Sequence, residues 1–340
     1  MRKALLISAL SLLALSNTAC EPGLAWGDPQ AVIVVAPQDW WPALEDSVLS
    51  ALSPPVWTVR QDYTFRVAYR TPDDTNNWWR FKELVLIAPP DETWLADALA
   101  ALPDSVTVTA PGLYEAQDVW ARGQKVNIVL VDRDEPVEPQ VYGRIGRVHQ
   151  NLLNRFLRGA ESRMFLSGRD SALVDTLSGT AGFSLLLPRV YDWGVEDSVH
   201  VFRNDNPDPS ELIRHFTVTW KTPGPADLPV DSLLDWRKSV AETYWPYPQV
   251  VNREALRVDT IPSGTLQGTE IRGTWANPPE STWPAAGAFI LRSVSCPHQD
   301  RLYLVDAWLY APGKDKWEYM LQLETILDSF RCGTQGIRPS

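Results

Sequence analysis

Two kinds of apolar pattern divide the sequence, and they constrain its fold more than any other feature. In the N-terminal half, continuous apolar runs at 31–35, 83–87 and 125–131 are typical of strands buried on both faces. Each run is followed by a proline-containing turn and then by residues with helical spacing. From about residue 183 the strands alternate instead, as in an antiparallel sheet with two different faces. The sequence therefore predicts two domains of different architecture.

The first domain repeats a strand–turn–helix unit. Its helices are expected at 40–52, 93–102 and 140–157. Asp39 and Asp91 stand where N-caps belong for the first two of them. Further strand-like stretches lie at 57–70 and 106–110. This order predicts an α/β or α+β domain in which helices pack on a mixed sheet.

The second domain has the order strands–helix–strands–helix. Its strands are expected at 183–187, 199–203, 213–221, 267–276, 288–296 and 301–310. Asp231 can cap a helix that runs to about Tyr244, and the final helix is expected over 314–331. One apolar stripe on that final helix, which includes Leu323 and Ile326, indicates packing on a sheet. An antiparallel sheet flanked by helices follows from this order.

A stretch with several glycines at 159–181 marks the expected domain boundary. The N-terminal α/β domain is therefore expected over 29–165, and the C-terminal antiparallel-sheet α/β sandwich over 166–332. Residues 333–340 are expected to form a flexible tail.

The start of the chain is typical of an export signal. Two basic residues precede the apolar stretch Ala4–Leu15, which is too short to span a bilayer because a mature helix needs about 20 apolar residues. The stretch leads to Cys20, and bacterial lipoprotein processing requires a cysteine at the cleavage point, because its thiol takes the diacylglyceryl group. We therefore expect 1–19 to be a signal peptide, Cys20 to carry lipid, and 20–28 to be a lipid-anchored tether.

An ordinary secreted protein is the alternative, because Asn17 stands where lipoprotein signals usually carry leucine. Removing the leader with its two positive charges changes the net charge from −11 to −13. A chain this acidic is not expected to bind nucleic acid or anionic lipid headgroups. No second apolar run approaches membrane-spanning length, so any membrane contact is expected through the lipid. The even pair Cys296 and Cys332 in an exported protein favours a disulfide, with two buried free thiols as the alternative.

Short motifs along the chain carry a family resemblance. They are the leader with Cys20, Asp118-Val119-Trp120-Ala121 with Gln124, Gly182-Phe183 with Pro188 and Tyr191, Arg272-Gly273-Thr274-Trp275, Tyr310-Ala311-Pro312 with Lys316, and Gln322-Leu323-Glu324 with Ile326, Leu327, Ser329 and Phe330. Their order and spacing resemble domain-of-unknown-function family 4837 (DUF4837), uncharacterised envelope lipoproteins of Gram-negative bacteria. Arg122-Gly123 departs from the lysine and proline expected there.

The resemblance implies a place in the cell envelope, lipid-anchored at the outer membrane on its periplasmic or surface side. It assigns no activity and no cofactor. The C-terminal half also resembles the PsbP-like α/β/α sandwich, whose members mostly bind or assemble rather than catalyse. A fold-level resemblance of this kind is a weak guide to function.

No recognised catalytic or metal-binding motif occurs in the sequence. Its histidines lack zinc-site spacing, and neither G-x-S-x-G nor S-x-x-K is present. Acidic clusters at 132–138 and 204–211 are interpreted as solvated turns with a helix cap. In the second cluster, Pro209 stands where an EF-hand calcium loop needs glycine. We therefore expect no metal and no cofactor. A catalytic triad can be assembled from dispersed residues, so a hydrolase remains one hypothesis.

Tryptophan is the remaining functional lead, since the chain contains 16 of them. Rigid aromatic faces stack on sugars and act as hot spots in protein interfaces. The candidate binding surface consists of Asp118, Trp120, Arg122, Arg272, Trp275 and Trp308. The leading hypothesis is a non-catalytic interaction or assembly module with an envelope protein as its partner. A lipoprotein that binds a glycan or small molecule through exposed tryptophans is the alternative.

Overall fold

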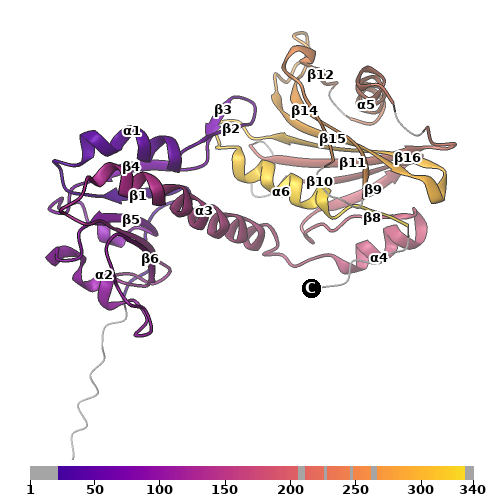
Figure 1. The fold of residues 1–340 in the computed structure, drawn as a ribbon. Coiled ribbons are helices and arrows are strands. Elements are labelled where there is room, and N and C mark those ends of the chain that lie inside the picture. The colour runs from indigo at the N-terminus through magenta and orange to yellow at the C-terminus, as the bar shows by residue number, and fades with distance from the viewer. Residues whose placement is uncertain (1–21, 206–210, 226–227, 246–247, 262–265, 334–340) are drawn as a thin grey trace, which may run out of the picture.

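The computed structural model describes residues 22–205, 211–225, 228–245, 248–261 and 266–333. Two domains, each combining helices with a β-sheet, are joined by the long helix α3 (Val137–Met164) (Figure 1). The predicted α+β class is therefore confirmed. The expected signal peptide 1–19, Cys20 and residues 334–340 of the expected tail lie outside the described residues.

The N-terminal domain contains a five-stranded mixed sheet with the order β4-β1-β5-β7-β6. Its strands are β1 (Ala31–Val35), β4 (Arg66–Arg70), β5 (Glu83–Ala88), β6 (Gly112–Gln117) and β7 (Lys125–Leu130). Four of them are parallel, and β6 runs antiparallel to β7. This arrangement is the mixed sheet that the apolar runs predict.

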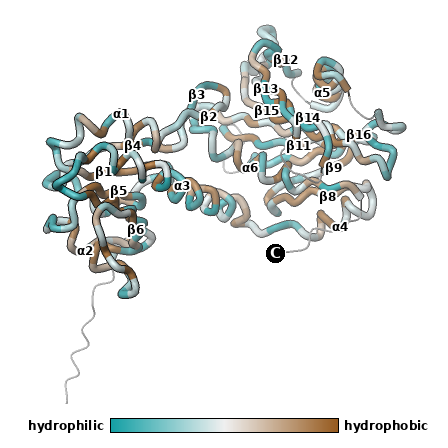
Figure 2. Tube along the Cα trace, in the orientation of Figure 1, coloured by the Kyte–Doolittle hydropathy of each residue, from teal (hydrophilic) through white to brown (hydrophobic). Residues whose placement is uncertain are grey.

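Helices cover both faces of this sheet. On one face α1 (Trp41–Leu52) and α3 enclose a core that includes Val34 and Val85. On the other face α2 (Ala96–Ala100) and η2 (Thr93–Leu95) pack against Leu84 and Leu86. Both sides of the central strands must be apolar for this packing, which explains their continuous hydrophobic runs (Figure 2). Smaller elements of the domain are η1 (Trp78–Arg80) and a hairpin of β2 (Pro55–Trp57) and β3 (Gln61–Tyr63).

The C-terminal domain contains an eight-stranded antiparallel sheet with the order β12-β14-β15-β16-β11-β10-β9, and β13 pairs with β14 as well. Its strands are β9 (Asp192–Glu196), β10 (Val199–Asn204), β11 (Ile213–Lys221), β12 (Val250–Val251), β13 (Arg257–Thr260), β14 (Gln267–Ala276), β15 (Ala286–Cys296) and β16 (Arg301–Tyr310). Other short elements are η3 (Arg253–Ala255), η4 (Pro297–Gln299), and the paired strands β8 (Phe183–Ser184) and β17 (Arg331–Cys332).

Three helices make this domain an α/β/α sandwich. Helices α4 (Ser171–Thr180) and α6 (Trp317–Asp328) cover the face that includes Ile290 and Val294, and α5 (Val230–Tyr244) covers the face that includes Phe289 and Leu291. Successive residues of a strand point to opposite faces, so the alternating pattern of β15 supplies both cores. The expected antiparallel sheet flanked by helices is confirmed.

The structure contains a disulfide between Cys296 and Cys332, whose Cα atoms are 5.9 Å apart. It joins the end of β15 to β17, across the 36-residue segment that contains β16 and α6. In the chain-entropy model, closing a loop of this length stabilises the folded state by about 3–4 kcal/mol. The bond fixes the last helix of the chain over the sheet.

Both N-cap predictions in the first domain are wrong. Helix α1 begins at Trp41, followed by Pro42, so Asp39 lies one position too early and no side chain caps this helix. The second helical segment begins with η2, whose N-cap is Glu92. Asp91 instead pairs with Arg133, at 3.3 Å.

Other differences from the sequence predictions lie at the ends of helices and at the edges of sheets, where apolar patterns are weak. The expected strand at 106–110 does not form, because Val106 and Val108 are exposed, and the strand that pairs with β7 is β6. Helix α3 is longer than expected at both ends. Near the start of the described chain, Ala25 hydrogen-bonds Arg122 and Trp26 hydrogen-bonds Arg80 through backbone atoms, so this part of the expected tether lies against the N-terminal domain.

Each domain inserts a side chain into the core of the other. Trp317, the first residue of α6, is buried in the N-terminal core, where it stacks on Phe156 of α3 with ring centroids 4.6 Å apart. In return, Val59 in the β2–β3 turn packs against the C-terminal core. Arg163 of α3 adds two hydrogen bonds to Glu318, at 2.8 and 3.0 Å. These contacts fix how the two domains are placed.

Replacing Trp317 by alanine is expected to lower the free energy of unfolding by about 3–5 kcal/mol, the usual cost of removing a large buried aromatic side chain. Because Trp317 joins the two domains, the radius of gyration measured by X-ray scattering is also expected to increase. Trp193→Ala is the matched control, since Trp193 is 45% exposed. Equal effects of the two substitutions in denaturant titrations would contradict the role of Trp317.

Candidate functional site

An open groove of about 680 Å³ lies between the two domains. We call it the interdomain groove. The N-terminal domain contributes the residues of β2, and the C-terminal domain contributes parts of β13, β14 and α6. Its lining residues are Pro55, Val56, Trp57, Arg257, Asp259, Thr260, Glu270, Arg272, Trp317, Met320, Leu321 and Glu324. Ligand pockets commonly have volumes of about 300–1,000 Å³.

The groove combines an aromatic–cationic pair with an apolar wall. The guanidinium carbon of Arg257 lies 5.3 Å from the ring centre of Trp57, within the range of a cation–π contact. Trp317 and Met320 of α6 are buried beside this pair, and Leu321 is partly buried. A ligand with both apolar and charged groups would match this lining.

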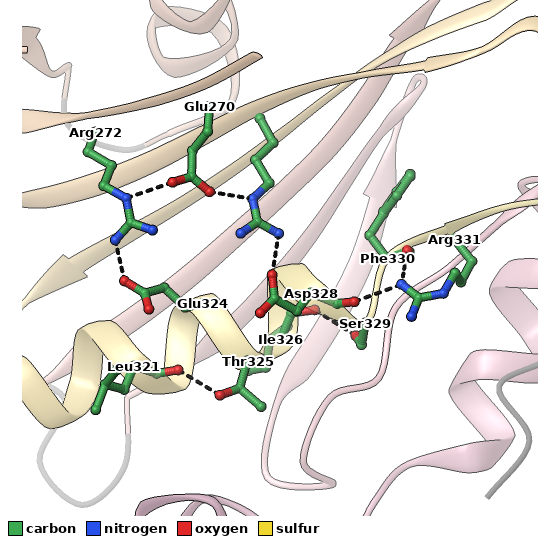
Figure 3. A network of polar contacts seen from close by, with 11 residues as sticks. Glu270, Arg272, Leu321, Glu324, Thr325, Ile326, Asp328, Ser329, Phe330 and Arg331 are labelled. Carbon is green, nitrogen blue, oxygen red and sulfur yellow. Dashed lines mark hydrogen bonds and ion pairs between the residues drawn. The ribbon is translucent and has the colours of Figure 1, made fainter. Parts of the chain in front are cut away.

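The sheet side of the groove holds a buried carboxylate between two arginines (Figure 3). Glu270 is 3% exposed. One of its carboxylate oxygens accepts a hydrogen bond from Nε of Arg272 at 2.7 Å, and the other accepts one from Nε of Arg292 at 2.7 Å. Because Glu270 and Arg292 are opposite each other in the β14–β15 register, the sheet itself places them together.

Helix α6 supplies the remaining two acids of this network. Glu324 pairs with Arg272, and one turn further along the helix Asp328 pairs with Arg292 at 2.8 Å. Burial acts to lower the pKa of Arg272, but Glu324 and Glu270 outweigh it and raise that pKa. Arg272 therefore stays charged, and its side chain is 27% exposed at the groove. We call these five residues the charge network.

The groove offers a ligand charged, aromatic and apolar contacts, and none of its lining residues is a histidine. Among the described residues, none of the four histidines has a hydrogen bond to a serine or a carboxylate. His215 is stacked on Trp308, and burial, aided by Arg203 and Arg237, lowers its pKa to about 3. His200 and His149 also have pKa values lowered by burial. The hydrolase hypothesis has no assembled triad at these positions.

The predicted C-terminal surface residues lie on opposite faces of the sheet. Arg272 is in the interdomain groove beneath α6, whereas Trp275 is buried beneath α5 with Trp308, their ring centroids 5.2 Å apart. Residues three apart in one strand point to opposite faces, which is why Arg272 and Trp275 do not form a common surface. Trp275 is 2% exposed and Trp308 is 7% exposed, so both belong to the core.

The other three predicted residues belong to the turn between β6 and β7. Asp118 accepts a hydrogen bond from the Gly123 backbone, and the indole of Trp120 donates one to Asp97 at 3.0 Å. Arg122 exchanges backbone hydrogen bonds with the residues that precede β1. These contacts stabilise the N-terminal domain, and the turn lies in a different domain from Arg272. The six candidates therefore do not form one surface.

Sequence reasoning missed most of the groove. Trp57, Arg257 and Glu324 are far apart in the chain, so no local motif could join them. A usable signal existed at Glu270 and Arg272, two charged residues on the same side of a strand with the apolar Ile271 between them. The other signal was Glu324 and Asp328, spaced four apart on the final amphipathic helix.

The described residues contain no cluster of three or more side chains suited to hold a metal ion. The acidic residues at 132–138 form no such cluster in the described chain, and part of the group at 204–211 lies outside the described residues. Among the helices that the structure describes, none has the length and apolar character needed to cross a bilayer.

The fold defines a two-domain α+β protein with an open groove between its domains. Residues 170–329 match the model of the family described as "Domain of unknown function (DUF4837)". The match begins at the N-cap of α4 and ends just after α6, so it supports this family for the C-terminal domain. The motif around Trp120 lies outside it.

No curated protein sequence shows significant similarity to this chain. The chain is similar in structure to the Ran-binding protein Mog1p of Saccharomyces cerevisiae, with 13% identity, coverage of 46% of this chain and 94% of that chain, and a TM-score of 0.31. It is also similar to human STARD10, with 9% identity, coverage of 51% and 74%, and a TM-score of 0.20. Similarities this low carry no argument about function.

Replacing Glu270 by alanine is expected to lower the free energy of unfolding by about 3–5 kcal/mol, because it leaves Arg272 and Arg292 without their shared carboxylate. The control is Glu324→Ala, which removes a carboxylate that is 26% exposed and is expected to cost about 1 kcal/mol or less. Denaturant titration of both variants measures the difference. A smaller effect for Glu270→Ala than for Glu324→Ala would contradict a buried charge network.

Proposed function

We propose that the protein is a lipid-anchored, non-catalytic binding module of the bacterial cell envelope. In this proposal the interdomain groove takes a segment of a partner envelope protein. The groove is the observation that carries the proposal, because both domains are needed to build it and their relative placement is fixed by Trp317. The export signal and Cys20 support the envelope location.

The groove also supports the choice of a protein segment. Its Trp57–Arg257 pair is exposed enough to contact a ligand, and aromatic and arginine side chains dominate the energetics of protein interfaces. Arg257 begins the edge strand β13, all four residues of which are exposed. An extended segment can add to such an edge through backbone hydrogen bonds while its side chains enter the groove.

Cys20→Ser is expected to abolish labelling by a radioactive or clickable fatty acid and to release the protein from membranes. Removing the thiol leaves no acceptor for the diacylglyceryl group. Cys332→Ser is the matched control, because it removes a different cysteine and should leave labelling intact. Membrane retention of the Cys20→Ser protein with an unchanged mass would refute the anchor.

A photo-reactive amino acid at Thr260 is expected to cross-link a partner protein in intact cells. Thr260 is an exposed lining residue of the groove. The control position is Tyr142, which is 73% exposed on α3 away from the groove. Combining Trp57→Ala with Arg257→Glu should reduce the Thr260 product about tenfold or more, since hot-spot residues often contribute about 2 kcal/mol each. Equal products at Thr260 and Tyr142, or products unaffected by these substitutions, would contradict the proposal.

A small molecule or glycan is the second candidate ligand, favoured by the groove volume, which lies within the range of small-molecule pockets. In that case the photo-reactive amino acid at position 260 would cross-link no partner protein. Native mass spectrometry of protein isolated from cells would instead show a bound small molecule, and Arg257→Glu would remove it.

A further inference from the structure

A second cavity, of about 390 Å³, lies between α3 and the amino ends of β5 and β7. We call it the basic pocket. It is separate from the interdomain groove, with which it shares no lining residue. Its lining residues are Pro29, Lys82, Glu83, Gly123, Arg155, Phe156, Arg158, Gly159, Ser162 and Arg163.

The pocket is positively charged within a protein that has a net charge of −11. Lys82 and Arg158 form no ion pair with any described residue. Arg155 forms an ion pair with Glu83 through Nε at 3.0 Å, but one of its terminal nitrogens is buried without a hydrogen-bond partner. Arg163 is neutralised by Glu318 of α6. The cations therefore exceed the acid groups, which favours an anionic ligand.

The floor of the pocket is a buried carboxyl group. Glu83 is 6% exposed, and its second carboxylate oxygen is buried without a hydrogen-bond partner. Burial raises the pKa of Glu83 to about 7, although Arg155, Lys125 and Lys82 act in the opposite direction. A buried polar atom without a partner is costly, so a ligand that forms a hydrogen bond with this oxygen would be stabilised.

We infer that the basic pocket binds a phosphate monoester group. Such a group carries between one and two negative charges near neutral pH and can also carry one proton. Its charged oxygens would lie against Lys82, Arg155 and Arg158, and one proton would be shared between Glu83 and the phosphate. A sulfate or sulfonate has the same shape but no proton to share near pH 7, so it is expected to bind more weakly.

The position of the pocket suggests two sources for the phosphate monoester that it would bind. Pro29 lines the pocket, and the backbone of residues 23–26 hydrogen-bonds to the neighbouring segments that contain Arg80 and Arg122. The pocket is thus on the side where the N-terminal segment meets the domain. If the proposed lipid anchor at Cys20 holds, a phospholipid headgroup is one source, and a soluble phosphate monoester is the other.

The test is calorimetric titration of the full chain, as purified from cells, with glycerol 3-phosphate. Arg158→Glu is expected to weaken binding about tenfold or more, because it reverses a charge that would contact the phosphate. Arg147→Glu is the matched control. It makes the same charge reversal on an exposed arginine of α3, about 16 Å along the helix and outside the pocket, and should change binding less than twofold.

Two more measurements check the floor of the pocket. Binding by the unaltered chain is expected to weaken as the pH rises through about 7, since Glu83 then ionises and repels the phosphate. Glu83→Gln keeps a hydrogen-bond donor without an ionisable group, so most of this pH dependence should disappear. Sulfate should bind at least several-fold more weakly than inorganic phosphate.

A competition experiment separates the two sources. Phosphatidylcholine vesicles containing phosphatidic acid should displace glycerol 3-phosphate if the pocket takes a lipid headgroup, and should leave it bound if the ligand is soluble. Absence of glycerol 3-phosphate binding at millimolar concentration, or equal weakening by the Arg158 and Arg147 substitutions, would overturn the inference. The titration does not need the anchor, so failure of Cys20 lipidation would leave its result unaffected.

Discussion

The arrangement of this protein depends on one buried indole. Trp317 begins a helix of the C-terminal domain, yet its side chain completes the core of the N-terminal domain between Phe156 and Phe65. The same helix forms one wall of the interdomain groove and carries two acids of the charge network. This packing contact thus determines how the two walls of the groove are placed. The groove exists because the domains exchange side chains instead of being joined by a flexible linker.

The C-terminal sheet has buried charges on both of its faces. Beneath α6, Glu270 is bonded to two arginines, and beneath α5, Arg237 is bonded to Asp306 at 3.0 Å and to Gln249 at 2.7 Å. Burial raises the pKa of Asp306, although Arg237 opposes this effect. Ion pairs of this kind add little net stability compared with apolar packing, but they penalise any register that separates the partners. Glu270 and Arg292 are opposite each other on β14 and β15, so the register of this strand pair is favoured by charge as well as by shape. Arg237 belongs to α5, so its bond to Asp306 favours the position of that helix on the sheet.

Much of the fold could be predicted from the sequence, because hydrophobic periodicity reports directly on burial. The buried strand β1 and the strands β11, β14 and β16 occur where their patterns indicate. Short edge strands such as β9 were not predicted, since their exposed residues have no apolar pattern. The predicted binding surface of six residues was wrong for a different reason. Tryptophan composition does not say which rings are buried, and the groove unites residues from positions 55 to 324 through tertiary contacts alone.

The disulfide also determines how the end of the chain responds to mechanical load. A pulling force applied beyond Cys332 passes through the sulfur bridge directly into β15, the strand between β14 and β16. Helix α6 and strand β17 are bypassed, so tension on the C-terminus cannot peel them away one turn at a time. The first element to bear the force is a strand hydrogen-bonded along both sides, which resists extension more strongly than a terminal helix. Reduction of the bridge would transfer the same load to the last helix.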